Sequence, residues 1–167
     1  MQKLPDLKIL LRIKMSSLYV TPSEFKIDSR FEEETYPVGF LPMSTVLLMD
    51  DRRYPWLVLI PRIEGVTELS DLGEAESQNL MQEIRQTMKV FEIVSKPDKH
   101  NVEALGNRIH QLHIHVIARF HSDEAWPRPV WNLGEKTVYP AHSAYILIDS
   151  LRDCFKNMEP GWISARP

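Results

Sequence analysis

Residues 110–119 read HQLHIHVIAR, and polar and apolar side chains alternate from Gln111 to His115. Because successive side chains on a β-strand point to opposite faces, this alternation predicts a strand from Gln111 to Arg119. Gln111, His113 and His115 share one face of that strand. The opposite face is purely apolar and suits a core: Leu112, Ile114, Val116 and Ala118. The stretch therefore predicts a core strand that presents three nitrogen-bearing side chains on its other face.

The flanking sequence predicts further strands and helices. Residues 45–49 and 56–60 favour strands, and the polar turn 50–55 between them indicates an antiparallel pair. Residues 73–94 carry apolar side chains at helical spacing, and a last helix is predicted at residues 141–155. The apolar positions of the longer helix are Leu80, Ile84, Met88 and Phe91. This order of elements predicts an α+β fold with a mainly antiparallel sheet, one long helix and a C-terminal helix.

Shorter signals complete the pattern. Asp28 is available to cap a short helix that carries Phe31. Ser70 or Asp71 is expected to cap the long helix, because both residue types accept hydrogen bonds from the first turn of a helix. Residues 101–105 favour a short strand.

The composition is typical of a folded domain and excludes several classes of protein. The chain has 167 residues, 43% hydrophobic and 26% charged, and is long enough to bury a core without disulfides. Its net charge of −3 gives no domain-wide basic field for nucleic acid, and no uncharged run suits a membrane span. Cys154 is the single cysteine, so neither an internal disulfide nor a cysteine-based zinc site is expected. A cytoplasmic location fits best.

We expect the chain to have three parts. Residues 1–17 are predicted to be a loose N-terminal extension, residues 18–135 the folded domain, and residues 136–167 a C-terminal helix and tail. Lys8 and Arg12 interrupt the apolar stretch near the N-terminus, which argues against a secretory signal there.

The histidine row has three interpretations from the residues alone. A neutral imidazole is both a nucleophile and a metal ligand, and a histidine pair on a half-exposed strand is often simply solvated. The wholly apolar opposite face and the third hydrogen-bonding group favour a functional row over solvation. A metal site needs three or four ligands. His113 and His115 supply two, and no nearby carboxylate has the strand parity and reach of an evident third ligand, although Asp123 and Glu124 lie close in sequence.

The motif strand and its surroundings resemble the histidine triad (HIT) family. Residues 111–117, QLHIHVI, match the family pattern His-x-His-x-His-x-x, with x apolar, except at the first position. Upstream, residues 49–51 lead through a turn to residues 57–62, LVLIPR, and the long predicted helix follows. The resemblance covers about residues 25–131, most of the chain.

The downstream sequence resembles a bacterial branch of the family similar to diadenosine tetraphosphate hydrolases. Residues 126–131, WPRPVW, carry this likeness. Trp126 and Trp131 are interpreted here as covering a core or an interface rather than bordering a nucleotide.

The resemblance implies a HIT-like fold and nucleotide chemistry. Family members bind a nucleotide and cleave its anhydride or phosphoramidate bond at the α-phosphate. The middle histidine, here His113, attacks phosphorus to give a nucleotidyl-histidine intermediate, and water or another acceptor releases the nucleoside monophosphate. His115 is expected to orient the phosphate, and Gln111 completes the catalytic set. No cofactor or metal is implied, because hydrogen-bond donors can hold the phosphate oxygens.

Other residues receive binding roles from the same resemblance. Asp50 matches the position that grips the ribose hydroxyls, with a plain turn residue as the alternative. Asn107 is expected at the phosphate or in a turn, and Asn101 has the weaker claim. Arg108 is expected to meet a polyphosphate tail or to point to solvent. The implied partners are an adenine nucleotide and a second copy of the chain in a homodimer, with no nucleic acid or membrane.

The sequence departs from the family pattern at three points. Gln111 replaces the first histidine, and an amide donates and accepts hydrogen bonds but carries no proton charge near neutrality. Arg108 stands where members often have Ser or Thr, and Pro55-Trp56 where many carry a histidine before the second strand's closing proline. Three functions therefore stay open: a nucleotide hydrolase or transferase, a nucleotide-binding module with little turnover, and a small metalloprotein using His113 and His115.

Overall fold

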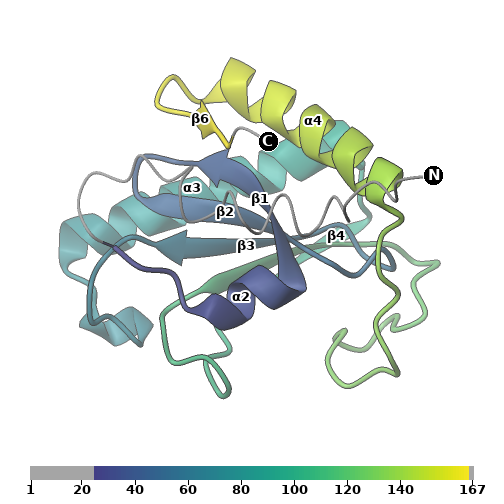
Figure 1. Cartoon of the computed structure of the whole chain (residues 1–167), viewed down its shortest axis with the longest axis horizontal. Coiled ribbons are helices and arrows are strands. Elements are labelled where there is room, and N and C mark those ends of the chain that lie inside the picture. The colour runs from purple at the N-terminus through teal and green to yellow at the C-terminus, as the bar shows by residue number, and fades with distance from the viewer. Residues whose placement is uncertain (1–24, 166–167) are drawn as a thin grey trace, which may run out of the picture.

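One antiparallel sheet organises the chain (Figure 1). The computed structural model describes residues 25–165. Its six strands follow the order β4-β5-β3-β2-β1-β6, and each pair of neighbours is antiparallel. The strands are β1 Thr35–Phe40, β2 Ser44–Met49, β3 Trp56–Pro61, β4 Lys99–Glu103, β5 Ile114–Arg119 and β6 Ile163–Ser164. The helices are α2 Ser29–Glu34, α3 Glu74–Val94 and α4 Ala141–Met158, with a short 3-10 helix at Leu69–Asp71. The α+β class is therefore confirmed.

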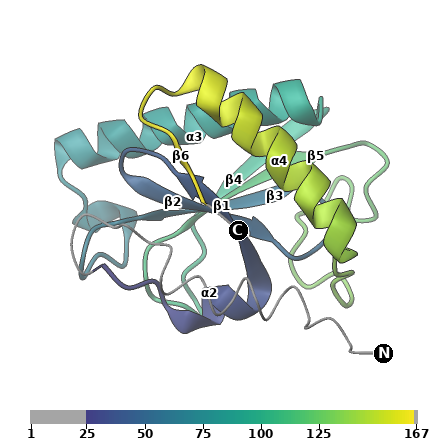
Figure 2. The same cartoon turned by 45° about the horizontal axis from the view of Figure 1, so that its top comes forward.

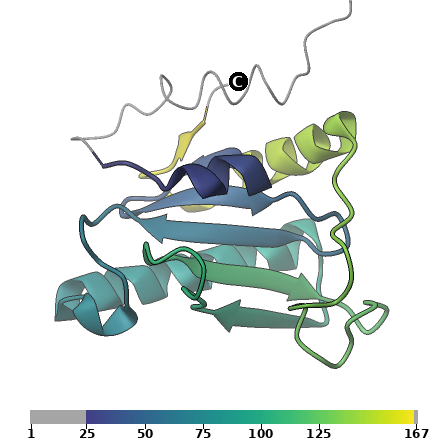
Figure 3. The same cartoon turned by 60° about the horizontal axis from the view of Figure 1, so that its bottom comes forward.

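The helices lie on opposite sides of the sheet. Figure 2 shows α3 and α4 together on one side and α2 on the other, and Figure 3 shows α2 in front of β1 and β2. A buried apolar cluster fills the space between the sheet and α3 and α4. A second cluster, which includes Phe31 of α2, covers the other face. Both faces of the central strands are thus buried, which suits their nearly continuous apolar sequences.

The motif strand is shorter than predicted. Its apolar face lies in the main core as expected, since Leu112, Ile114, Val116 and Ala118 all belong to that cluster. The strand itself begins at Ile114 rather than Gln111. The preceding backbone leaves the sheet because the N–H of Leu112 donates to the carbonyl of Val66, 3.1 Å away.

Most other predicted elements are confirmed within a few residues. The strands β2 and β3 pair as an antiparallel hairpin, and Asp28 caps α2 by accepting from the N–H of Arg30. The cap of α3 was predicted wrongly. Asp71 belongs to the 3-10 helix, and Gly73 precedes α3, with its N–H bonded to the side chain of Glu76.

The strands β1 and β6, at one side of the sheet, were not predicted. Pro37 and Gly39 are unusual inside a strand, and a bulge between them absorbs the irregularity. A side chain at Gly39 would collide with Trp162 and with the backbone of Ile163, so only glycine lets β6 approach β1.

Two expectations concern the ends of the chain and the membrane. The predicted extension, residues 1–17, lies outside the described residues.

Between residues 25 and 165 no helix combines the length and the apolar character needed to cross a membrane.

Candidate active site

A cleft of about 480 Å³ opens on the sheet face that carries His113 and His115. This volume is within the range of small-molecule sites, roughly 300–1,000 Å³. One wall is apolar and aromatic, and the rim is charged. The apolar wall is formed by Phe31, Met49, Ile109, Val130, Trp131 and Leu133. The cleft therefore has room and surface for a ligand with a flat ring and a charged tail.

The His113 imidazole is buried, with 5% of the residue exposed, and its tautomer is set by the main chain. Its Nδ1 lies 2.7 Å from the carbonyl oxygen of Gln111. A carbonyl only accepts, so Nδ1 carries the hydrogen and the lone pair is on Nε2. Burial lowers the pKa of His113 below its usual 6.5, and the bond to the carbonyl opposes that shift. The residue therefore presents a neutral, nucleophilic nitrogen.

His115 lies beside His113 and is also buried. The two ring centroids are 4.8 Å apart, and the rings are nearly perpendicular at 81°. The Nδ1 atom of His115 is 3.0 Å from the indole Nε1 of Trp56. Burial is the main cause that lowers the pKa of His115 to about 3, and electrostatic interaction with the neighbouring His113 acts in the same direction. His115 is thus a neutral hydrogen-bonding group.

Trp131 packs against the second core cluster, as the sequence indicated, and it also lines the cleft beside His115. Its ring centroid lies 4.9 Å from that of His115 at an angle of 76°, and it lines the cleft. Its indole N–H donates to the carboxylate of Glu103 on β4. Trp126 does not line the cleft and instead packs on His121, with 4.5 Å between the two ring centroids.

The side chain of Gln111 does not join the two histidines in the cleft. Its Oε1 accepts from the N–H of Asp28 at 3.0 Å, and its Nε2 donates to the carbonyl of Lys26 at 2.9 Å. The residue at the first triad position therefore holds the segment before α2 with its side chain and supports His113 with its backbone.

Of the neighbouring carboxylates Asp50 and Asp51, only Asp51 lines the cleft, where Glu34 is a further carboxylate. Asp50 is buried and accepts from the N–H of Tyr139 at 2.9 Å, and it does not line the cleft. Asp51 lines the cleft and is held by Arg53, whose Nη2 lies 2.6 Å from its Oδ2. Alternation along β2 was the available signal, because Leu47 and Met49 face the histidine side of the sheet and Asp51 continues their parity.

Asn101 has a structural role. Its Oδ1 accepts from Nη1 of Arg119. The buried Arg119 guanidinium also donates to Asp123 at 2.7 Å and to the carbonyl of Arg128 at 3.0 Å. This network ties β4 and β5 to the loop that follows them, and Asn101 does not line the cleft.

Asn107 and Arg108 line the cleft, and so do the cationic side chains of Arg30, Arg53 and Lys136. The Arg108 side chain is 82% exposed and lies 3.7 Å from Glu34. Arg30 is held by Asp28 at 2.6 Å, whereas Lys136 is exposed at the rim. The rim thus carries one loosely paired arginine and one exposed lysine.

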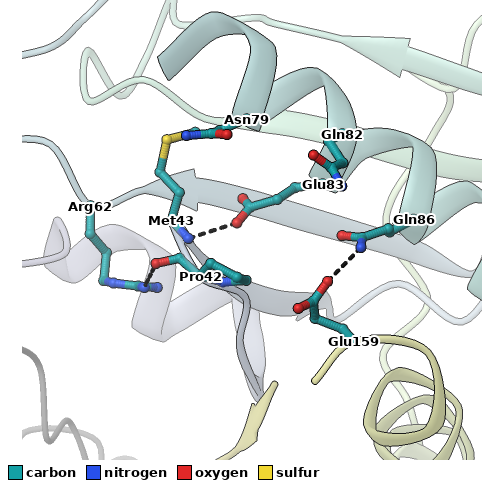
Figure 4. A pocket seen from close by; sticks show the side chains of 8 residues that line it. All are labelled: Pro42, Met43, Arg62, Asn79, Gln82, Glu83, Gln86 and Glu159. Atoms are coloured by element: carbon teal, nitrogen blue, oxygen red, sulfur yellow. Dashed lines mark hydrogen bonds between the residues drawn. The ribbon is translucent and has the colours of Figure 1, made fainter. Parts of the chain in front are cut away.

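A second cavity of about 420 Å³ lies over α3, away from the histidines (Figure 4). Figure 4 shows its polar groups turned toward one another: Glu83 accepts from the N–H of Met43 at 2.6 Å, and Gln86 donates to Glu159. Burial raises the pKa of Glu83 above its usual value. No histidine or cysteine is among its lining residues, so the histidine cleft is the candidate active site.

Metal binding was one interpretation of the histidine pair. In the part of the chain that the structure describes, no group of three or more His, Cys, Asp or Glu side chains is placed to hold a metal ion.

The fold and the histidine pair place this chain among α+β proteins that carry a histidine motif at a strand of an antiparallel sheet. A family model described as HIT domain matches residues 30–122, more than half of the chain. The matched region contains β1 to β5, α3 and both histidines. The chain belongs to the HIT family.

Solved structures support this assignment. A histidine triad protein from Bradyrhizobium japonicum is 40% identical, with a TM-score of 0.76, over 78% of this chain and 98% of that chain. One from Sinorhizobium meliloti is 33% identical, with a TM-score of 0.75, over 77% and 96%. One from Marinobacter aquaeolei is 32% identical, with a TM-score of 0.77, over 81% and 98%. The comparison with curated proteins gave no match.

Proposed function

We propose that this HIT protein cleaves nucleotides at the α-phosphate through a covalent nucleotidyl intermediate on His113. The bond between Nδ1 of His113 and the Gln111 carbonyl is the observation that carries the proposal. It directs the lone pair to Nε2 and keeps the ring in one tautomer. A buried imidazole of lowered pKa is neutral near physiological pH, as a nucleophile must be.

The first step exchanges one bond at phosphorus. The lone pair of Nε2 attacks the α-phosphorus, a phosphorus–nitrogen bond forms, and the bond to the leaving group breaks with its electron pair. The positive charge that develops on the imidazole is stabilised by the Gln111 carbonyl at Nδ1. His115, on β5, donates a hydrogen bond toward the phosphate oxygens.

The second step restores the enzyme. Water attacks the same phosphorus, the phosphorus–nitrogen bond breaks, and its electron pair returns to Nε2. The proton from the water passes to solvent, and a nucleoside monophosphate leaves the cleft.

The leaving group decides which substrates this chemistry suits. With an amide at the first triad position, no third imidazole is available to protonate a departing amine. A polyphosphate departs as an anion without a proton. We therefore propose dinucleoside polyphosphates, as in the branch similar to diadenosine tetraphosphate hydrolases, as substrates preferred over phosphoramidates. Arg108 and Lys136 at the rim supply charge for the departing phosphates.

The remaining parts of the cleft accommodate the nucleoside. The apolar wall with Phe31 and Ile109 suits an adenine base. We assign the ribose hydroxyls to Asp51, which lines the cleft and is held by Arg53. We propose a homodimer through α3 and the edge strand β4, where Val102 is 41% exposed. We propose a cytoplasmic location.

A nucleotide-binding module with little turnover is the second candidate function. The observation that favours it is the Gln111 side chain, which is bonded to Lys26 and Asp28 rather than placed at the histidines. Such a protein would bind a nucleotide in the same cleft and release little product.

Product release in excess chelator separates these functions. Purified protein is incubated with a panel of diadenosine polyphosphates and an adenosine phosphoramidate, beside His113→Ala. His110→Ala is the matched control, because His110 is exposed in the same stretch and does not line the cleft. We expect AMP release by the wild type and by His110→Ala but not by His113→Ala. AMP binding without release would support the binding module, and activity lost to chelator would support a metalloprotein.

A further inference from the structure

Trp56 and His115 make a buried side-chain contact beside the proposed nucleophile. Trp56 is 7% exposed and His115 4%. Trp56 is paired with Ile117, and His115 with Val58, so the two side chains are diagonal neighbours on one face of β3 and β5. At this separation an indole reaches an imidazole across the strands. Their nitrogens lie 3.0 Å apart.

We propose that Trp56 is a positioning residue that fixes His115 as the tautomer with its hydrogen on Nε2. The indole N–H donates and never accepts, so the facing Nδ1 of His115 must be the acceptor. A neutral imidazole has one donor and one acceptor, which leaves the hydrogen on Nε2. The proposal rests on the proposed function, in which His115 donates to phosphate.

The other groups that face His115 in the described part of the chain are directed elsewhere. Immediately before β5, His113 directs its Nδ1 to the Gln111 carbonyl rather than to His115. On β4, Glu103 lies opposite His115 in the strand register, but its carboxylate accepts from the indole of Trp131. Trp131 touches the His115 ring at a ring-centroid distance of 4.9 Å, with its N–H directed to Glu103. Trp56 is thus the hydrogen-bond partner that selects the tautomer.

The same bond keeps His115 neutral. Protonation of Nδ1 would break the bond and place two N–H groups against each other in a buried site. The lowered pKa that burial gives His115 acts in the same direction. The consequence for the reaction is a division of roles, in which His115 is a permanent donor and His113 alone changes its bonding.

Trp56 also stands where the family pattern often has a histidine. An imidazole at that position exchanges its donor and acceptor atoms and titrates, whereas an indole does neither. With Trp56 as its partner, the tautomer of His115 is therefore less sensitive to pH than it would be with a histidine at position 56.

Nitrogen NMR of the ligand-free protein tests the proposal directly. Imidazole ¹⁵N shifts distinguish a protonated from an unprotonated ring nitrogen. We expect a single His115 tautomer in the wild type, with the hydrogen on Nε2. In Trp56→Phe we expect averaging between tautomers and titration of His115 at higher pH. Trp126→Phe is the control for the NMR signal, because it removes an indole that packs on His121 and leaves the groups around His115 unchanged.

A second variant covers failure of Trp56→Phe to fold. Benzothienylalanine at position 56 replaces the indole N–H with sulphur and keeps the shape of the ring. It should give the same change in tautomer. In turnover, kcat is expected to fall about tenfold with KM little changed, because one oriented donor is weakened rather than removed.

The outcomes separate this proposal from the proposed function. The role of Trp56 is overturned if the variants without the indole N–H still show His115 only as the Nε2–H tautomer. It is also overturned if His115 of the wild type carries its hydrogen on Nδ1. Because the spectra need no substrate, the NMR result is independent of whether the protein turns over a nucleotide. If the Trp56 variants change the tautomer of His115 but the wild type turns over no nucleotide, the role of Trp56 stands and the proposed enzyme activity does not.

Discussion

Nδ1 of His113 lies 2.7 Å from the carbonyl oxygen of Gln111, two residues earlier in the chain. The group that orients the proposed nucleophile is thus a main-chain carbonyl, that of the residue at the first triad position. Any side chain at position 111 leaves that carbonyl in place. The replacement of the first histidine by glutamine is therefore compatible with a correctly oriented His113.

Removal of the Gln111 side chain should affect stability more than chemistry. Gln111→Ala removes the bonds to Asp28 and Lys26 and is expected to cost about 1–2 kcal/mol of unfolding free energy. Urea unfolding measures this loss, and kcat should stay within roughly a factor of three. A large fall in kcat at unchanged stability would mean that the amide takes part in the reaction.

The pH dependence of activity should report His113. Its pKa is lowered from 6.5 by burial, so the neutral nucleophile predominates at pH 6.5 and above. We expect log kcat/KM to be flat there and to fall on the acid side. An acid limb with its midpoint above 6.5 would contradict the burial of His113 in the working enzyme.

The free energy of unfolding should also depend on the protonation of His113. The unfolded chain takes up the proton first as the pH falls, because the folded-state pKa is the lower one. The contribution to stability is therefore complete above pH 6.5 and declines as the pH falls from 6.5 toward the folded-state value. His113→Gln should reduce this acid loss in thermal unfolding curves.

Asn101 should matter for the fold and not for catalysis. Asn101→Ala leaves the buried Arg119 guanidinium without one acceptor and is expected to cost about 1.5–3 kcal/mol of unfolding free energy. Its kcat and KM should match those of the wild type at a temperature where both are folded. Asn107→Ala, at a residue that lines the cleft, is the contrasting variant. A raised KM in Asn101→Ala would restore Asn101 to the substrate site.

Arg108 should distinguish long from short leaving groups. Arg108→Ala is expected to raise KM for diadenosine polyphosphates severalfold, and less so at high salt, because the side chain is 82% exposed. KM for an adenosine phosphoramidate should barely change. Arg128→Ala is the matched control, since it removes an exposed arginine that neither lines the cleft nor lies on α3. Equal effects of Arg108→Ala on both substrate types would argue against a polyphosphate subsite.

The regular elements could be predicted because their patterns are local. Alternation from Leu112 to Ala118 identified the core side of β5, and the spacing from Leu80 to Phe91 identified α3. The strand β1 could not be predicted, because Pro37 and Gly39 are accommodated only by a bulge and by the approach of β6. The support from β6 comes from residues far away in the sequence.

The site was predictable only in part for the same reason. Strand parity brought His113 and His115 together, and they line one cleft as expected. Parity failed for Gln111, because the backbone leaves the sheet before Ile114 and the segment at Lys26 and Asp28 captures the amide. The bond from Trp56 to His115 depends on the register of β3 against β5, which the sequence does not state.

Trapping the covalent intermediate tests the central claim most directly. Protein mixed with excess diadenosine polyphosphate is quenched in alkali, which preserves a phosphoramidate bond, then digested and examined by mass spectrometry. An adenylate is expected on the peptide at His113, present in His110→Ala and absent in His113→Ala. AMP release with no adduct at any time, or an adduct on another residue, would contradict nucleophilic attack by His113.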